Sequence, residues 1–120
     1  MKNISAAALK EFFISGANNI ANNYKHIDAL NVFPIPDGDT GKNMMMTIQS
    51  GVKNIVNVET SHCGELASAF SRGLLLGARG NSGVILSQVF RGICSILKEN
   101  EEVDTKLFAK ALKKATEIAY

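Results

Sequence analysis

The sequence predicts an all-α protein. In five segments apolar residues recur at spacings of three and four, which is the period of a helix that buries one face. No segment shows the alternation of apolar and polar residues, bounded by turn residues, that is typical of a strand. The 120 residues are 46% hydrophobic and 20% charged, which is the composition of a globular protein rather than of a disordered chain.

The first expected helix carries its apolar residues between Leu9 and Tyr24. Ser5 precedes this pattern, and its hydroxyl can accept a hydrogen bond from an unpaired amide of the first turn. A separate short turn of helix is expected over residues 27–30. The N-terminal quarter of the chain is therefore expected to form one long amphipathic helix followed by a turn.

The second expected helix begins near Thr40. Before it, Pro34 and Pro36 remove amide donors and push their predecessors towards extended geometry, so residues 31–41 cannot be helical throughout. Because methionine fills irregular apolar gaps, the methionines of this helix are expected in the core rather than in a cofactor site. The inner face is expected to carry Met44, Met45, Ile48, Val52, Ile55 and Val56.

The third and fourth expected helices are joined by a glycine-rich loop, residues 77–83. The third helix ends at Gly77, and the fourth begins near Ser82. Because the fourth is apolar around most of its circumference, it is expected at the centre of the fold. The inner residues expected are Leu66, Phe70, Leu74 and Leu75 in the third helix, and Val84, Ile85, Leu86, Val89, Phe90, Ile93, Ile96 and Leu97 in the fourth.

The fifth expected helix begins at Asp104 or Thr105, either of which can cap it. It runs to Tyr120 without the glycine or proline that often follows a helix. Residues 1–120 are therefore expected to be the N-terminal part of a longer domain, truncated in mid-helix. Leu107, Phe108, Leu112, Ala115 and Ile118 are expected to face inward, and Lys106, Lys110, Lys113 and Lys114 to form a solvated face.

Charge and cysteine content argue against several classes of protein. The net charge is +2 and the basic residues are scattered, whereas nucleic-acid-binding proteins concentrate theirs on one face. Two cysteines without metal-type spacing, and no secretory signal, indicate a reducing compartment; Cys94 is expected in the core and Cys63 in a loop. The longest apolar stretch is too short to span a bilayer, so no transmembrane segment and a cytoplasmic location are expected.

Residues 36–41, Pro-Asp-Gly-Asp-Thr-Gly, can form a metal site. Gly38 and Gly41 let the loop curl, so that Asp37 and Asp39 aim at a common point. Two carboxylates that close repel each other unless a cation lies between them, and magnesium takes one or two carboxylates together with water and phosphate oxygens. An Asp-Gly turn with incidental acids also explains these residues. The spacing fits neither an EF-hand nor a zinc site.

Two helix starts are candidates for anion binding. Thr40 and Asn43 lie in the first turn of the second helix, where unpaired amides and the positive end of the dipole attract phosphate. In the second loop, glycines such as Gly80 let backbone amides approach a phosphate, and Ser82 can donate to it. Each feature also has a purely structural explanation, because the same side chains can simply cap a helix.

Familiar phosphate and nucleophile motifs do not fit these loops. Residues 38–43 lack the spacing of a Walker motif and its Ser or Thr after lysine. The second loop follows a helix rather than a strand, which argues against a dinucleotide fingerprint, and its serine lacks the second glycine of a nucleophile elbow. His26 and His62 have no triad-like neighbours and are expected at the surface or in loops.

Taken together, the two loops resemble those of a known family. Residues 31–44 read Asn-Val-Phe-Pro-Ile-Pro-Asp-Gly-Asp-Thr-Gly-Lys-Asn-Met, and residues 77–88 read Gly-Ala-Arg-Gly-Asn-Ser-Gly-Val-Ile-Leu-Ser-Gln. Over essentially its whole length the chain resembles the N-terminal nucleotide-binding domain of bacterial fatty acid kinase, which is similar to the L subunit of dihydroxyacetone kinase. The resemblance implies an antiparallel barrel of eight amphipathic helices, of which this chain supplies about the first five.

The resemblance also implies a site for ATP or ADP bound through two magnesium ions. Asp37 and Asp39 match the metal-binding aspartates of the family. The dihydroxyacetone kinase relatives place a third aspartate where this chain has Val32, so Asn31 is the expected third ligand, with Asp28 as another candidate. The residues expected to contact the phosphates are Thr40, Gly41, Asn43, Gly80, Asn81 and Ser82.

The activity implied is phosphoryl transfer, in which positioning and charge neutralisation provide most of the catalysis. A fatty acid presented by a separate fatty-acid-binding carrier protein of the DegV type would become an acyl phosphate. A carboxylate acceptor needs no general base, so no catalytic side chain is expected here, and the chain alone is expected to be inactive. Any homodimer is expected to form through regions outside this chain.

Two alternatives stay open. One is a nucleotide-binding subunit of a dihydroxyacetone kinase; the Pro34-Ile-Pro36 lead-in, and Thr40 where that subunit has histidine, favour the fatty acid kinase instead. The other is a non-catalytic helical interaction module, in which both loops only cap helices.

Overall fold

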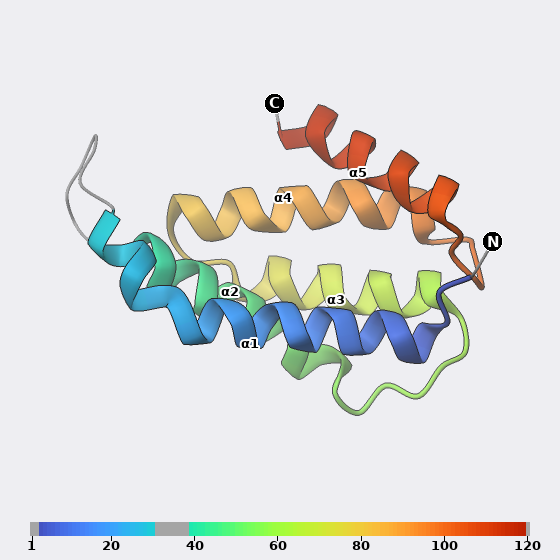
Figure 1. Cartoon of the computed structure of the whole chain (residues 1–120), viewed down its shortest axis with the longest axis horizontal. Coiled ribbons are helices and arrows are strands. Elements are labelled where there is room, and N and C mark those ends of the chain that lie inside the picture. Colours follow the sequence, from blue (N-terminus) through green and yellow to red (C-terminus); the bar gives the residue numbers. More distant parts are fainter. Residues whose placement is uncertain (1–2, 31–38, 120) are drawn as a thin grey trace.

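The computed structural model describes residues 3–30 and 39–119, and this part of the chain is all-α, as the sequence predicts (Figure 1). Within the described ranges the regular secondary structure consists of helices, and two extended segments meet in a single antiparallel bridge between Ile4 and Val103. None of the described helices is both long enough and apolar enough to cross a membrane. The helices are α1 (Ala6–Leu30), α2 (Thr40–Ile55), α3 (Cys63–Gly77), α4 (Gly80–Leu97) and α5 (Thr105–Ala119).

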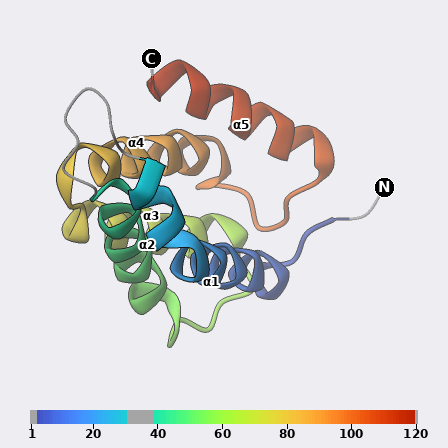
Figure 2. The ribbon, with the colours of Figure 1, turned by 60° about the vertical axis from the view of Figure 1, so that its left-hand side comes forward.

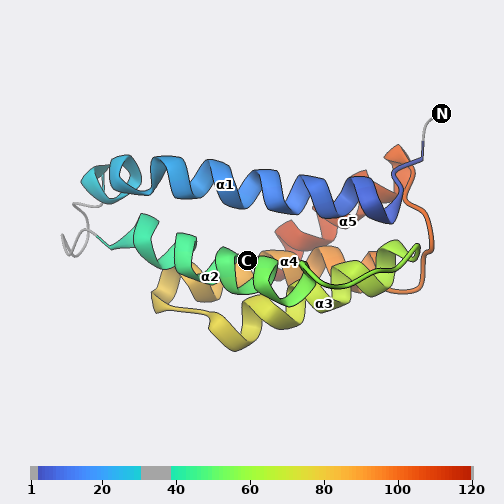
Figure 3. The ribbon, with the colours of Figure 1, turned by 90° about the horizontal axis from the view of Figure 1, so that it is seen from below.

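Successive helices run antiparallel to one another (Figure 1). Figure 3 shows α2 between α1 and α3, and α2 also packs against α4. Among the described helices α5 contacts only α4, and Figure 2 shows it standing apart from α1. This order places the N-terminus of α2 and the N-terminus of α4 at the same end of the molecule.

Three phenylalanines join α1, α3 and α4 in the core. The rings of Phe13 and Phe70 are stacked, with their centroids 4.2 Å apart and their planes 5° from parallel. Phe90 meets both rings edge-on, at 5.8 Å from Phe13 and 5.0 Å from Phe70. Because Phe70 is buried at the centre of this group, the cluster fixes the distance between the three helices.

The end of the molecule opposite the two helix starts is closed by backbone hydrogen bonds. The amides of Cys63 and Gly64, at the start of α3, donate to carbonyl oxygens of the α4–α5 connection over 2.8 and 2.9 Å. Cys63 is thus a buried helical residue, and the expectation that it lies in a loop is wrong. Burial, and then the negative charge of Glu102, raise the pKa of its thiol.

Helix boundaries differ from the expected ones in two places. α1 continues without interruption to Leu30, so the separate turn expected over residues 27–30 does not exist. α4 begins at Gly80, two residues before Ser82, because Gly80 adopts a φ of 65° and lets the chain leave the extended residue Arg79 directly into a helix.

Two of the predicted caps are confirmed. The hydroxyl of Ser5 accepts a hydrogen bond from the amide of Ala8 over 3.1 Å, at the start of α1. Oδ1 of Asp104 accepts from the amide of Leu107 over 2.7 Å, at the start of α5. These short-range contacts depend only on neighbouring residues, which is why the sequence reveals them.

Several apolar residues expected to face inward are exposed. α5 packs on α4 but not on α3, and the apolar residues where α3 ends and α4 begins lie at the surface of the described structure. The helical period alone does not tell how far along a helix its neighbour extends, so the central position expected for all of α4 is wrong for Val84 and Ile85 near its N-terminus. The residues that were expected to face inward but are exposed are Leu75 on α3, Val84 and Ile85 on α4, Leu112 on α5, and Val56 directly after α2.

Candidate functional site

The N-termini of α2 and α4 lie side by side (Figures 1 and 3). The Ser82 hydroxyl donates a hydrogen bond to the backbone carbonyl of Thr40 over 3.1 Å, and both residues are half-buried. The structure therefore brings together the two loops that the sequence singles out separately. Because the single hydroxyl proton of Ser82 is directed at Thr40, the group that Ser82 can offer a phosphate here is its backbone amide.

One face of α2 supports the turn between α3 and α4. Thr40, Asn43 and Thr47 are three and four residues apart, so they share this face. The side-chain amide of Asn43 lies against Gly80, and Oγ1 of Thr47 accepts a hydrogen bond from the amide of Arg79 over 3.0 Å. Of these residues, Thr47 and Arg79 were not expected at the site from the sequence.

Gly80 makes this close approach possible. Its φ of 65° lies in the left-handed region, which costs glycine little and other residues considerably more. A Cβ at this position would also overlap the side-chain amide of Asn43. Gly80 is thus required by the packing of the turn on α2, and Asn43 packs beneath that turn, whether or not either residue contacts a phosphate.

The start of α2 carries negative charge. Asp39 occupies the N-cap position, but its carboxylate makes no capping hydrogen bond and is half-buried. Asp28, in the last turn of α1, accepts a hydrogen bond at Oδ1 from the amide of Lys42 over 3.0 Å. Gly41 is buried against the backbone carbonyl of Tyr24, where a side chain would not fit. Two carboxylates therefore lie at the positive end of this helix dipole.

The start of α4 has the opposite character. Its N-cap residue is Arg79, which makes no side-chain capping bond, and its first turn contains no acidic residue. The amide of Gly83 donates to the carbonyl of Arg79 over 3.1 Å. Helix geometry leaves the three preceding amides, at residues 80–82, without an acceptor in the helix. These donors and the exposed Arg79 are available to an anion.

Part of the predicted metal site lies outside the described residues. Asp37 and Asn31 belong to residues 31–38, so their position relative to Asp39 is not described and the predicted pairing stays a prediction. Among the described residues, no three or more His, Cys, Asp or Glu side chains gather closely enough to hold a metal ion. Of the three ligands expected first, Asp37, Asp39 and Asn31, the structure describes Asp39, whose carboxylate is free of capping bonds.

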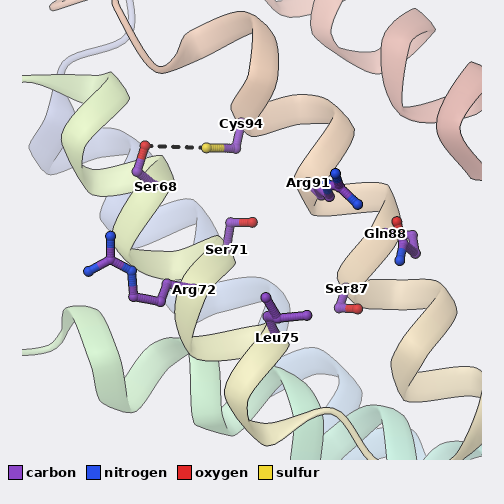
Figure 4. Close-up of a pocket in the computed structure, with 8 residues that line it drawn as sticks. All are labelled: Ser68, Ser71, Arg72, Leu75, Ser87, Gln88, Arg91 and Cys94. Carbon is purple, nitrogen blue, oxygen red and sulfur yellow. Dashed lines mark hydrogen bonds between the residues drawn. The ribbon is translucent and has the colours of Figure 1, made fainter.

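A separate pocket of about 250 Å³ lies between α3 and α4, beyond the helix starts (Figure 4). Figure 4 shows Ser71 and Leu75 pointing towards α4, whereas Arg72 points away from it. Ser68 and Cys94 are joined by a hydrogen bond of 3.3 Å. The lining residues include two arginines, Arg72 and Arg91, but no acidic residue, so no carboxylate is available here to hold a cation or to accept a proton.

Comparison with known proteins finds one matching family model and several similar proteins. A family model described as "DAK2 domain" matches residues 34–120. A protein of Staphylococcus epidermidis is 48% identical over 117 residues, and one of Staphylococcus aureus (strain USA300) is 47% identical over the same length. Each comparison covers 98% of this chain, and the chain spans 21% of the length of each relative. Both relatives carry only the name "uncharacterized protein".

Proposed function

The chain belongs to the DAK2 domain family, and from this premise we propose that it is the nucleotide-binding part of a kinase. ATP or ADP binds with its phosphates between the N-termini of α2 and α4. The observation that carries this proposal is the hydrogen bond from Ser82 to Thr40. This bond joins the start of α2, which carries carboxylates, to the start of α4, which has free backbone amides. A polyphosphate that is bound through a divalent cation needs both kinds of surface.

The charges at the two helix starts support this division. A phosphate about 4 Å from a carboxylate near a protein surface is repelled by roughly 4 kcal/mol. Asp28 and Asp39 therefore make the start of α2 a poor site for a bare phosphate, in spite of its dipole. A cation between them and the phosphate turns this repulsion into attraction. The start of α4, with Arg79 and no acid in its first turn, suits the phosphate itself.

The residues present fit magnesium as the cation. Asp39 provides a carboxylate that no hydrogen bond of the helix cap occupies. We propose that Asp37 and Asp39 hold the metal with Asn31 as the third protein ligand, and that two ions are bound. When bound, magnesium neutralises charge that builds up on the phosphate oxygens during transfer. The chain's own contribution is to orient the phosphates through the amides at residues 80–82.

We also propose that residues 1–120 are the first part of a larger helical barrel. Leu75 and Leu76 at the end of α3, and Val84 and Ile85 at the start of α4, are exposed on the described structure. Apolar residues that gather at a surface usually mark an interface. Further helices of the same barrel would cover them, and the relatives are long enough to contain such helices.

The phosphoryl acceptor proposed is a fatty acid. A carrier protein of the DegV type presents the fatty acid, and phosphoryl transfer converts it to an acyl phosphate. This finer assignment rests on the residues around the first loop, namely the Pro34-Ile-Pro36 lead-in and Thr40. Dihydroxyacetone is the alternative acceptor. Whichever is correct, the chain spans 21% of the length of its relatives, so the rest of such a protein can contribute to the acceptor site.

Calorimetric titration with ATP, with and without magnesium, tests the nucleotide site. Titration of this chain and of the longer protein should show binding that EDTA abolishes. Asp39→Asn should weaken magnesium-dependent binding at least about tenfold, as losing a group from a metal's surroundings does elsewhere. Asp104→Asn is a matched control, because Asp104 also precedes a helix but caps α5 at the other end of α4. Equal affinities for both variants would leave a non-catalytic helical module as the better explanation.

A transfer assay with the longer protein separates the two acceptors. Radiolabelled ATP is offered with a fatty acid and its carrier protein, or with dihydroxyacetone, under the same conditions. Label in an acyl phosphate supports the fatty acid kinase. Label in dihydroxyacetone phosphate would assign the other kinase, and the nucleotide site described here would serve either reaction.

A further inference from the structure

Thr47 is one of two buried polar side chains in the described part of the chain, the other being Ser87. The Ser87 hydroxyl donates to the carbonyl of Val84 in its own helix over 2.7 Å, so its partner is local. Thr47 differs, because its Oγ1 accepts a hydrogen bond from the amide of Arg79, 32 residues further along the chain. A completely buried hydroxyl on α2 is thus bonded to the turn between α3 and α4.

The amide of Arg79 belongs to no helix. Ala78, which follows α3, and Arg79, which precedes α4, are both extended, with ψ angles of 131° and 130°. The amide between them therefore takes part in neither ladder of helical hydrogen bonds, and the Thr47 hydroxyl is its acceptor. Loss of that acceptor would leave a donor without a partner, which costs more than the bond itself contributes.

Thr47 also lies against the first turn of α4. A Cβ on Gly83 would overlap Oγ1 of Thr47, so hydroxyl and backbone are in direct contact. The Thr47 side chain therefore contacts both ends of the turn formed by residues 79–83. The middle of that turn carries the amides of residues 80–82.

We propose that Thr47 is a positioning residue for phosphate binding, whose hydroxyl fixes the turn at residues 79–83 against α2 and so sets the direction of its free amides. This inference rests on the proposed nucleotide site, to which it adds a residue that touches no ligand. The bonds Thr47–Arg79 and Ser82–Thr40 hold the turn at two points, so it cannot swing about either one. Amides ordered in advance bind an anion more tightly than amides that must be ordered on binding.

The test compares three variants of the full-length protein. Thr47→Val keeps nearly the shape of threonine but offers no acceptor, whereas Thr47→Ser keeps the hydroxyl. Ser50→Ala is the matched control, because the Ser50 hydroxyl on α2 donates to the carbonyl of Gly73 over 2.8 Å. That variant loses a hydrogen bond between two helices, and its side chain lies against Gly77 at the end of α3 rather than against residues 79–83. Calorimetry gives the Kd for ATP with magnesium, and hydrogen exchange at the hydrogen-bonded amides of Arg79 and Gly83 reports how firmly the turn is held.

Thr47→Val should raise this Kd about tenfold, which corresponds to the loss of one buried hydrogen bond. It should also speed hydrogen exchange at Arg79 and Gly83, the two amides of the turn that are hydrogen-bonded. Thr47→Ser should restore both values to within about twofold of wild type, and Ser50→Ala should lower the melting temperature without changing either. A wild-type Kd in Thr47→Val, an equal loss of affinity in Ser50→Ala, or no recovery in Thr47→Ser would each overturn the proposal.

Hydrogen exchange also separates a failure of this inference from a failure of the proposed function. A wild-type protein that does not bind ATP with magnesium would refute the nucleotide site, and with it any role in phosphate binding. Unchanged exchange at Arg79 and Gly83 in Thr47→Val, in a protein that does bind ATP, would refute the positioning role alone.

Discussion

Oδ1 of Asp28 accepts a hydrogen bond from the amide of Lys42, over 3.0 Å. The last turn of α1 therefore caps the first turn of α2. The carboxylate satisfies an amide that helix geometry leaves unpaired, and its charge interacts favourably with the dipole of α2. An acid that the sequence offered as a metal ligand thus has a structural role of its own.

Replacement of Asp28 should show this role in the absence of nucleotide and magnesium. Asp28→Ala should lower the free energy of unfolding by about 1 kcal/mol, the usual effect of losing a helix cap. Asp28→Asn should cost less, because the amide oxygen still accepts the hydrogen bond. Urea denaturation measures both, with Asn22→Ala, an exposed change on α1, as the control. Equal stabilities for Asp28→Ala and the control would show that the contact contributes nothing.

Gly80 and Gly16 should respond in opposite directions to the same substitution. Gly80→Ala should lower the free energy of unfolding by about 1 to 2 kcal/mol from its positive φ alone, and further through overlap with Asn43. Gly16→Ala should be neutral or should stabilise by about 0.5 to 1 kcal/mol, because Gly16 is helical and nothing lies within 4 Å of the added Cβ. Thermal denaturation of both variants checks the pair. A stable Gly80→Ala protein would mean that the turn does not need its left-handed residue.

The sequence reveals those parts of the fold that depend on near neighbours. The helical periods predict all five described helices, and the caps at Ser5 and Asp104 follow from hydroxyl and carboxylate groups three residues before their partners. What it misses depends on residues far apart in the chain. Cys63 is buried only because the N-terminal segment and the α4–α5 connection fold over it, and Val84 is exposed because α5 covers another part of α4.

The candidate site divides in the same way. Thr40, Gly80 and Ser82 could be selected from the sequence, because glycines and hydroxyls at a helix start suggest an anion site. The contact between Thr40 and Ser82 could not be predicted from the sequence, because the two residues are 42 positions apart in the chain. Thr47 lay in a run of apolar residues that predicts core, and its hydroxyl acquires a role only when α4 is placed beside α2.

The two thiols should react at different rates. Cys63 is completely buried and its thiol donates to the carbonyl of Ile4 over 3.3 Å, whereas Cys94 is half-buried and lines the pocket between α3 and α4. A thiol reagent should therefore modify Cys94 in the folded protein and Cys63 only after unfolding. Mass spectrometry of tryptic peptides after timed labelling checks this order. Faster labelling of Cys63 would mean that the N-terminal segment opens readily.

The pH dependence of stability should carry a signature of Cys63. Burial, then the charge of Glu102, raise its pKa above the ordinary value of 9.0, so the folded state holds this proton more tightly than the unfolded state. The resulting stabilisation is complete below the unfolded pKa and is lost as pH rises through the folded pKa. Unfolding free energy should therefore fall more steeply above pH 9.0 in the wild type than in Cys63→Ala. Parallel slopes in urea titrations would contradict this expectation.

Ser82 and Thr47 should be energetically coupled, because each holds the same turn against α2. Ser82→Ala removes the bond to Thr40 and should lower the free energy of unfolding by about 1 kcal/mol. Once the turn is free at one end, the second bond can no longer fix its direction. The double variant Ser82→Ala with Thr47→Val should therefore lose less affinity for ATP with magnesium than the product of the two single losses, by about threefold, which is 0.6 kcal/mol of coupling. Calorimetry on the four proteins of this cycle measures the difference. Strictly multiplicative losses would mean that the two bonds act on separate parts of the site and that no rigid turn connects them.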